Sequence, residues 1–485
     1  MQLKNKKKED VIMNREKNLA KNTIIITLGK VCTQMITFFL LPLYTGILST
    51  REYGTVDLLN TLVGLLLPIV TFQVEQAMFR ELIEVRENEK EKIRIISSGV
   101  ITVIVQCIIY LFIFAFVSPF INNDYKIFLA TNVVVYIFLS LFQQIARGLG
   151  DNTKFAIGSF ISAFTAILFN ILFLVVIKLG ATGMLLGTMI GQITGSLYLF
   201  ISLKLYKYIK IKEYKKEIIK KLWKYSVPLI PNAISWWVFN ASDRVIASGI
   251  LGVDQNGILA AALKFSAVYI TLYNIFNMSW TESISMAIND EDVESYFNKM
   301  FNIVLSLFIA LAVGLIACMP FIFPIMINKN YGNGYGLIPI SIIASVFNVI
   351  VGLISVIYIA KKNTKAIANT SIVSAIINIV VHLVLIKFLG LYAAVISTFT
   401  AYFVMSIYRL IDVKKRYFKI EINRQIIFKT LPVLFIVMIA YYINNIYFNI
   451  LSILLSVVLA WSLNKNSIEI IIKFIKRKTL KDNEV

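Results

Sequence analysis

Charged side chains are scarce in this sequence, and acidic ones are scarcer than basic ones. Only 15% of the 485 residues are charged, and 48 Lys and Arg against 27 Asp and Glu give a formal net charge of +21. A soluble domain carries about 25% charged residues. In a soluble protein this positive charge would suggest a nucleic-acid partner, but 58% of the chain is hydrophobic. We therefore expect an all-α polytopic membrane protein with no nucleic-acid partner.

Cysteine and histidine are also sparse. The three cysteines, Cys32, Cys107 and Cys318, all lie in apolar runs, so we expect buried thiols and no disulfide framework. A single histidine argues against a zinc or haem site. No Gly-rich phosphate loop with its Lys is present, which argues against ATP as the direct energy source. We expect no catalytic site, no metal and no cofactor.

Long apolar runs are what the sequence has in abundance. Runs of about 17 residues or more, separated by polar residues, predict about fourteen membrane-spanning helices. They lie near 23–48, 55–79, 95–121, 125–146, 155–177, 181–203, 225–250, 258–284, 300–327, 335–360, 366–386, 391–408, 429–444 and 446–463. Between the last two spans, Asn444 and Asn445 form a tight turn or interrupt a single helix.

The basic residues indicate how the spans are oriented. Forty of the 48 Lys and Arg fall on the side that holds both termini, and five fall on the other side. The remaining three, Lys30, Arg244 and Lys264, lie within spans. Cytoplasmic loops carry the excess of Lys and Arg in membrane proteins. The pattern predicts cytoplasmic termini and an even number of spans.

Two short motifs recur in the same order and indicate an internal repeat. Gly46-Ile47-Leu48 matches Gly249-Ile250-Leu251 at an offset of 203, and Asn152-Thr153-Lys154 matches Asn363-Thr364-Lys365 at an offset of 211. Six spans separate the copies, so both halves face the same way, which predicts two parallel six-helix lobes. The expected segments are a basic tail 1–22, a first lobe 23–210, a basic linker 211–224, a second lobe 225–411, two extra helices with their preceding loop 412–463, and a tail 464–485.

Three motifs resemble one transporter family. The first motif is Leu41-Pro42-Leu43-Tyr44-Thr45 with Leu48-Ser49-Thr50-Arg51-Glu52-Tyr53-Gly54, the second is Val74-Glu75-Gln76-Ala77-Met78-Phe79-Arg80, and the third is Ser242-Asp243-Arg244 with Leu251-Gly252. All three resemble motifs of bacterial polysaccharide transporters, the O-antigen or oligosaccharide flippases. The resemblance implies the fold of the multidrug/oligosaccharidyl-lipid/polysaccharide exporter superfamily, two lobes around a central cavity. It also implies a bacterial plasma membrane and an undecaprenyl-pyrophosphate-linked oligosaccharide as substrate.

Ionisable groups within spans are the first candidates for function, because they are costly in hydrocarbon. Lys30 and Glu75 lie at similar depth near the cytoplasmic side, and Asp243, Arg244 and Lys264 lie at similar depth near the outer side. In one interpretation, Lys30–Glu75 and Asp243–Lys264 are structural pairs. In the other, Lys30, Arg244 and Lys264 form a cavity that attracts the pyrophosphate.

Further polar and aromatic groups are weaker candidates. Glu282 either lines the inner mouth or snorkels to the interface, and His382 either relays protons or is a packed, hydrogen-bonded residue. Ion coupling would use Glu75, Asp243, Glu282 or His382. Side chains that would contact the sugar, or simply pack between helices or against lipid, are Asn232, Asn240, Trp236 and Trp237.

The leading hypothesis is a flippase that works by alternating access in the plasma membrane. An inside-negative potential of about 100 mV would favour export of two negative charges by roughly 4–5 kcal/mol, so the potential alone is a sufficient driving force. Proton or sodium antiport through Glu75, Asp243 or His382 is the alternative. Expected partners are membrane lipid, the polyprenyl-pyrophosphate-linked oligosaccharide, and the glycan polymerase or glycosyltransferases of the same pathway. The first alternative is a drug or organic-cation exporter of the same fold, which would require an acidic or aromatic cavity. The second is a membrane glycan polymerase or ligase, which would require a large outer loop with catalytic groups.

Overall fold

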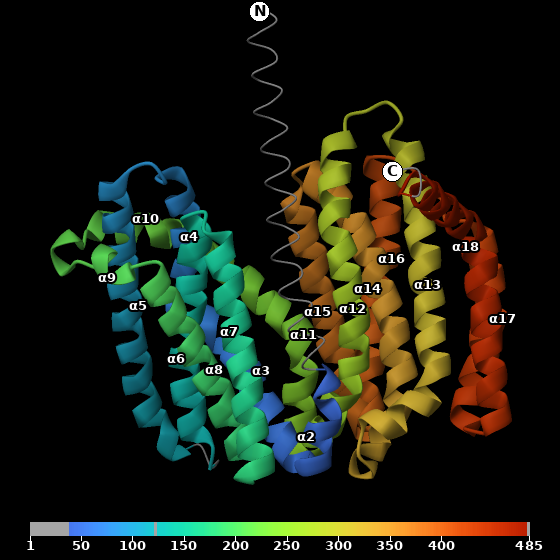
Figure 1. Cartoon of the computed structure of the whole chain (residues 1–485), viewed down its shortest axis with the longest axis horizontal. Coiled ribbons are helices and arrows are strands. Elements are labelled where there is room, and N and C mark those ends of the chain that lie inside the picture. The colour runs from blue at the N-terminus through green and yellow to red at the C-terminus, as the bar shows by residue number, and fades with distance from the viewer. Residues whose placement is uncertain (1–37, 121–123, 483–485) are drawn as a thin grey trace, which may run out of the picture. The chain divides into compact units, whose positions relative to one another are not determined.

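The chain folds into two helical units, which are described separately below. The computed structural model describes residues 38–120 and 124–482, and every regular element in those ranges is a helix (Figure 1). The first unit is Met1–Ala241 and the second is Ser242–Val485. Within the described ranges, 12 helices are long and apolar enough to cross a membrane. The expected all-α polytopic fold is confirmed.

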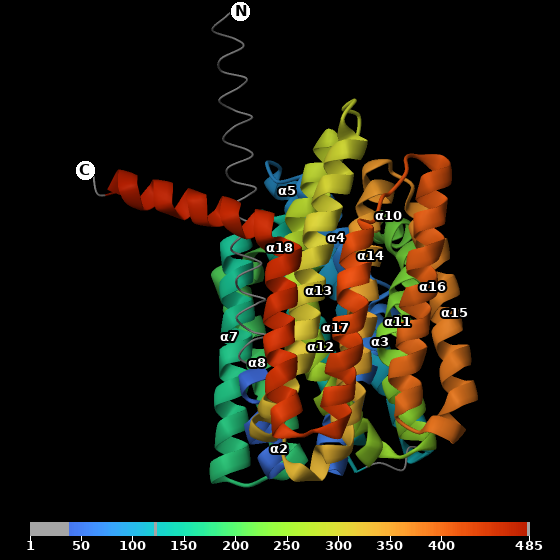
Figure 2. The same ribbon diagram turned by 90° about the vertical axis from the view of Figure 1, so that its right-hand side faces the viewer.

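The helices follow one another with short connections. In the first unit they are α2 (Leu41–Ile47), α3 (Thr50–Thr71), α4 (Val74–Glu84), α5 (Glu89–Val117), α6 (Lys126–Gly148), α7 (Asn152–Ile171), α8 (Gly180–Ser202), α9 (Leu205–Tyr208) and α10 (Lys216–Ser226). The boundary between the units falls inside α11 (Ile230–Ile250). In the second unit they are α12 (Val253–Ala287), α13 (Val293–Met326), α14 (Ile338–Ala360), α15 (Thr364–Leu389), α16 (Tyr392–Arg416), α17 (Arg424–Ile443) and α18 (Ile446–Asp482). Figure 2 shows α17 and α18 beside α13, at the edge of this unit.

The expected count of fourteen spans stays a prediction. Twelve of the expected ranges correspond to the 12 candidate spans. Most of the range 23–48 lies outside the described residues, and the range 225–250 corresponds to α11, which is not among the 12. At Asn444 the backbone is left-handed, with φ 51°, so the last two spans are separate helices joined by a tight turn.

One expected span is broken. The range 55–79 divides into α3 and α4, because Phe72 and Gln73 are both left-handed, with φ 51° and 58°. The Thr71 hydroxyl accepts a hydrogen bond of 3.1 Å from the amide of Gln73, which supplies the partner that the broken helix no longer offers. Gln73 and Glu75 make the sequence polar at this break, but the expected range was drawn through them.

The first repeated motif marks the junction between two helices in both units. The amides of Leu48 and Leu251 each close the preceding helix with a bond of 2.9 Å to the carbonyl four residues earlier. Ser49 and Gly252 follow as N-caps; their ψ values of 160° and 158° agree, but their φ values of −67° and 102° do not. The helix junction thus recurs at the offset of 203, whereas the turn itself differs in conformation.

The second repeated motif is also present, but its expected register is wrong by one residue. Asp151 and Asn363 share backbone angles of −91°, 60° and −92°, 62°, and each amide donates a bond of 2.8 Å to the carbonyl five residues earlier. The preceding residues, Gly150 and Lys362, both have positive φ. Asn363 thus corresponds to Asp151, at an offset of 212. What the turn preserves is a left-handed residue followed by an Asn or Asp, and not the identity of the triplet.

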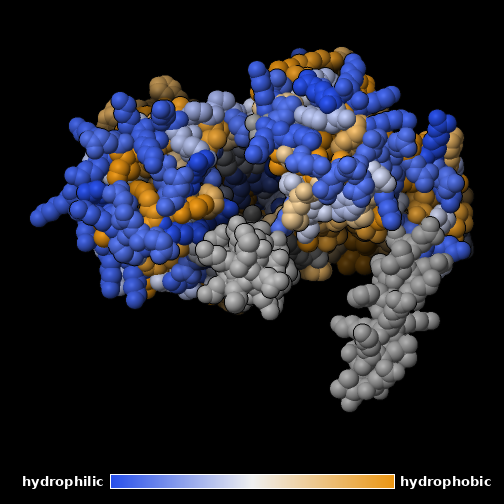
Figure 3. Space-filling view, turned by 90° about the horizontal axis from the view of Figure 1, so that it is seen from above, coloured by the Kyte–Doolittle hydropathy of each residue, from blue (hydrophilic) through white to orange (hydrophobic). Residues whose placement is uncertain are grey.

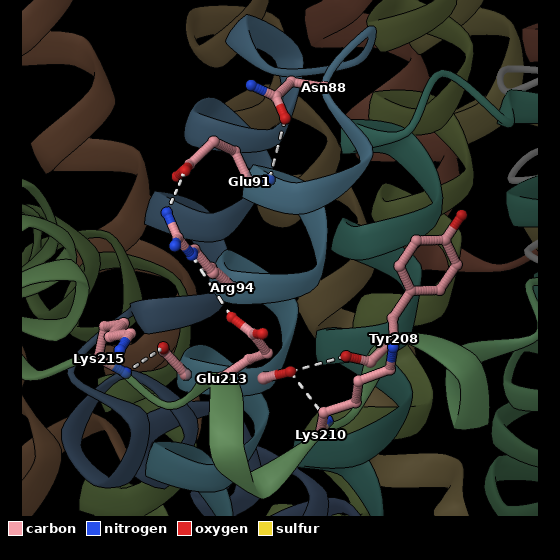
Figure 4. Close-up of polar contacts among 9 residues, drawn as sticks. Asn88, Glu91, Arg94, Tyr208, Lys210, Glu213 and Lys215 are labelled. Atoms are coloured by element: carbon pink, nitrogen blue, oxygen red, sulfur yellow. Dashed lines mark hydrogen bonds and ion pairs between the residues drawn. The ribbon is translucent and has the colours of Figure 1, made fainter.

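The basic linker before α11 is an ordered structure. The Ser97 hydroxyl on α5 donates to the Tyr208 carbonyl at 2.7 Å and accepts from the Lys210 amide at 2.9 Å (Figure 4). The neighbouring Ser98 hydroxyl accepts from the Lys215 amide at 3.0 Å. We call this the basic end of the first unit, and the basic end of the second unit is the end that carries the Lys361–Lys365 turn. Figure 3 shows hydrophilic residues gathered on one face of each unit.

A stripe of glycines on α8 allows close contact with α7. Gly187, Gly191 and Gly195 recur at every fourth position, so they share one face of the helix. A Cβ at Gly191 would lie 2.4 Å from the Ser162 carbonyl oxygen, and one at Gly195 would lie 2.6 Å from the Ser162 Cβ. Small residues at this spacing let membrane helices pack backbone to backbone.

We therefore expect Gly191→Ala to destabilise the first unit by about 1–3 kcal/mol, because the added methyl has no space and the helices must separate. The measurement is the thermal unfolding midpoint of the purified protein in detergent. Gly314→Ala on α13 is the matched control, since nothing lies within 4 Å of the added methyl. An unchanged midpoint for Gly191→Ala would contradict the close α7–α8 contact.

Candidate functional site

The first motif of the family resemblance has a structural role. The Ser49 hydroxyl accepts from the Glu52 amide at 3.2 Å, and the Glu52 carboxylate accepts from the Ser49 amide at 2.9 Å. This is a capping box at the start of α3. The same carboxylate accepts from the Ala181 amide at 3.3 Å, which fixes α3 to the start of α8. These residues order the first unit, and their known contacts leave little capacity for substrate.

Glu75 is the buried acid of the first unit. It lies in the first turn of α4, where the helix dipole favours a negative charge, and its side chain is only 1% exposed. One carboxylate oxygen, Oε2, has no hydrogen-bond partner among the described residues. Its expected partner, Lys30, lies outside the described residues, so this pairing remains a prediction.

The aromatic and amide candidates on α11 differ from one another. Trp237 donates from Nε1 to the Thr61 carbonyl at 2.8 Å, which anchors α11 to α3 within the first unit. Trp236 is 47% exposed, and Asn232 is also exposed. The side chain of Asn240 lies outside the described part. Trp237 is thus a packing residue, whereas Trp236 and Asn232 remain accessible candidates for sugar contact.

The second unit buries a polar centre around Asp243 of α11. Carboxylate oxygen Oδ1 lies 2.7 Å from Nδ1 of His382 on α15 and accepts a bond of 3.3 Å from the Ser397 hydroxyl of α16. The other oxygen, Oδ2, accepts from the Thr398 hydroxyl at 2.7 Å. All these side chains are at least largely buried, and His382 is 0% exposed. Three helices thus converge on one carboxylate.

Asn378 orients the hydroxyls of this centre. It lies one turn before His382 on α15, and residues four apart share one face of a helix. Its Nδ2 donates to the Thr398 hydroxyl at 3.2 Å and to the Ser397 hydroxyl at 3.4 Å, and its Oδ1 accepts from the Ser242 hydroxyl at 3.2 Å. The asparagine completes a network in which each carboxylate oxygen of Asp243 is satisfied.

The structure adds a partner that sequence depth did not predict. Asp243 has His382 as an ionisable partner, with Nδ1 2.7 Å from Oδ1. The expected Asp243–Lys264 pair stays a prediction. Arg244 and Lys264 are half-buried on α11 and α12, and Glu282 is exposed near the end of α12.

The centre lies inside the span rather than at its edge. Asp243 and His382 each lie seven residues before the end of their helices, at Ile250 and Leu389, which is about 10 Å along the axis. Imidazole is the side chain whose unperturbed pKa allows it to titrate between about pH 5 and 8. Nε2 of His382 has no hydrogen-bond partner among the described residues. The centre therefore joins a carboxylate to an imidazole inside the protein, which makes it the candidate site for coupling to an ion.

Arg409 is a buried cation that the hydropathy pattern missed. The twelfth span was expected to end at residue 408, which placed Arg409 in a cytoplasmic loop, but α16 continues to Arg416. The Arg409 side chain is 1% exposed. Met405, four residues before Arg409, lies on a buried face of α16. This helical spacing is the sequence pattern that could have predicted a buried Arg409.

The comparisons with known proteins agree with this architecture. The sequence matches the family described as "Polysaccharide biosynthesis protein" over residues 19–281. Among curated proteins, none matches this sequence. An inward-facing multidrug resistance MATE family transporter of the MOP superfamily aligns with a TM-score of 0.66 and 13% identity, covering 81% of this chain and 99% of that chain.

Two further solved structures share the fold. The lipid II flippase MurJ, in an inward closed conformation, aligns with a TM-score of 0.65 and 17% identity, covering 93% of this chain and 100% of that chain. A MOP superfamily transporter from Pyrococcus furiosus aligns with a TM-score of 0.55 and 14% identity, covering 82% and 95%. At such identities the likeness concerns the fold alone. Because the family match covers more than half of the sequence, this multi-pass membrane protein belongs to the polysaccharide biosynthesis protein family.

Proposed function

We propose that the protein is a flippase that moves an undecaprenyl-pyrophosphate-linked oligosaccharide from the cytoplasmic to the outer leaflet of a bacterial plasma membrane. Membership of a polysaccharide biosynthesis family supports a glycan substrate. The fold, which the chain shares with a structure titled as a lipid II flippase, supports translocation of a lipid-linked substrate. The product would serve surface polysaccharide assembly.

The observation that carries the mechanism is the buried Asp243–His382 contact of 2.7 Å. Imidazole is the side-chain type used most often to carry protons in proteins, and here it contacts a buried carboxylate. We assign the coupling ion as the proton, carried inward as the glycan moves outward. The membrane potential adds to the driving force of the proton gradient, because the pyrophosphate crosses with negative charge.

Arg244 and Lys264 are the cations of the second unit that this mechanism assigns to the pyrophosphate. Arg244 follows Asp243 directly on α11, and both cations are half-buried in apolar helices. A guanidinium binds phosphate through two parallel hydrogen bonds, and an ammonium supplies a point charge. Lys30 would contribute a third positive charge from the first unit, as the sequence predicts.

The first test of the proposal is complementation of a strain that lacks its own oligosaccharide flippase, with surface glycan as the readout. We expect the unaltered protein to restore surface glycan. We expect Asp243→Asn to lower the amount of surface glycan by roughly fivefold or more, because energetic coupling between two sites usually changes an equilibrium by at least that factor. Asp254→Asn is the matched control, because Asp254 is exposed at the start of α12. Protein amounts are compared by immunoblot.

Two results of this experiment have different meanings. Restoration by Asp243→Asn at equal protein amount would contradict the coupling role and leave the flippase assignment standing. Failure of the unaltered, membrane-inserted protein to restore glycan, together with resistance to cationic drugs, would contradict the flippase assignment and favour the drug exporter.

The second test separates the driving forces in vesicles that contain the purified protein. We expect transport to respond to an imposed pH gradient and to an imposed potential, and His382→Gln to lose the response to pH between about pH 5 and 8 while keeping the response to potential. The readout is protection of a labelled lipid-linked oligosaccharide from an external glycosidase. If His382→Gln keeps the full pH response, the proton is carried elsewhere.

A further inference from the structure

A second polar site lies on α15 and α16, at the basic end of the second unit and well away from Asp243. It is a pocket of about 390 Å³, within the size range of ligand sites. One wall comes from the start of α15, with Lys365, Asn369 and Thr370, and the other comes from the end of α16, with Asp412 and Arg416. The proposed flippase mechanism uses none of these residues.

The charge behind the pocket is Arg409, which is buried and lacks a carboxylate. Its Nη2 and Nε donate to the Thr370 hydroxyl at 2.8 and 3.1 Å, and Nη1 donates to the Ser355 hydroxyl and, at 3.4 Å, to the Val351 carbonyl. None of these partners is an anion within the described part of the chain. A buried guanidinium bound only by neutral groups retains a large desolvation cost. Thr370 is shared between this cation and the pocket wall.

The acid in the pocket does not neutralise Arg409. Asp412 accepts from the Arg416 Nε at 2.7 Å and from the Tyr358 hydroxyl at 2.8 Å, so its charge is already matched by Arg416. Arg409 and Lys365 therefore leave two positive charges around the pocket. The Asn369 amide adds a neutral donor on the same wall. This donor set matches an anion with several oxygen atoms, such as a phosphate.

The apolar part of the pocket indicates that the phosphate belongs to a lipid. Val373 and Val404 line it away from the charged mouth and are 55% and 38% exposed. The exposed apolar stripe of α15 continues from Val373 through Ile376 and Val380. A free phosphate or nucleotide gains nothing from such a stripe, whereas an acyl chain does.

We propose that this pocket binds the phosphate headgroup of an anionic phospholipid from the leaflet at the basic end. The headgroup phosphate lies beside Lys365 and Asn369, in front of Thr370, where it compensates the buried charge of Arg409. One acyl chain follows Val373 and Ile376 along α15. The lipid then joins the ends of the two helices that hold His382 and Thr398.

The test uses the full-length protein in detergent with added phosphatidylglycerol, and it measures bound lipid by native mass spectrometry and the thermal unfolding midpoint. We expect saturable binding of one lipid with a rise in the midpoint, and about fivefold weaker binding for Lys365→Gln, the effect of one basic residue at a membrane surface. Lys414→Gln is the matched control, since it removes a charge from the same end of α16 without touching the pocket wall.

A second variant tests the proposal in case Lys365 contributes little to lipid binding. Arg409→Met removes the buried charge, and we expect it to abolish the rise in midpoint caused by lipid, whatever its own midpoint without lipid. Equal binding by the wild type, Lys365→Gln and Arg409→Met would overturn the proposal, as would equal binding of phosphatidylcholine. An equal rise in midpoint with inorganic phosphate alone would overturn the assignment to a lipid.

Discussion

A charged side chain in hydrocarbon must find its partners within the protein, because no water is present to solvate it. Asp243 shows how strongly this constraint shapes the second unit. Its two carboxylate oxygens receive His382, Ser397 and Thr398 from α15 and α16, so one acid determines how three helices meet. The buried network between these three helices follows from satisfying this group.

The same two helices satisfy a charge of opposite sign at their basic end. Arg409 is bound by hydroxyls and a carbonyl where Asp243 has an imidazole, and Thr370 lies twelve residues before His382, about 18 Å along α15. The acidic centre is complete within the protein, whereas the basic one lacks an anion among the described residues. This difference explains why the first is suited to a proton and the second to an external ligand.

Sequence reasoning predicted the helical class and twelve ranges that match candidate spans, because these depend on hydropathy. It identified Asp243 and His382 separately but not as a pair, since the contact depends on how α11 and α15 face each other. Arg409 was missed because its charge ended the apolar window that defined the span. The break at Phe72 was missed although Gln73 and Glu75 are polar, because the expected range was drawn through them to Phe79. Pairing and helix faces are tertiary properties that hydropathy does not encode.

The repeat gives the two units the same scaffold with different chemistry. At the offset of 212 found for the second turn, His382 corresponds to Asn170 on α7. Asn170 donates to the Tyr44 hydroxyl of α2 at 3.3 Å, and α2 corresponds to α11 through the first repeated helix junction. The equivalent helix pair is therefore joined by a neutral hydrogen bond in the first unit and by a titratable pair in the second. The equivalent positions thus hold an amide and a phenol in the first unit and an imidazole and a carboxylate in the second.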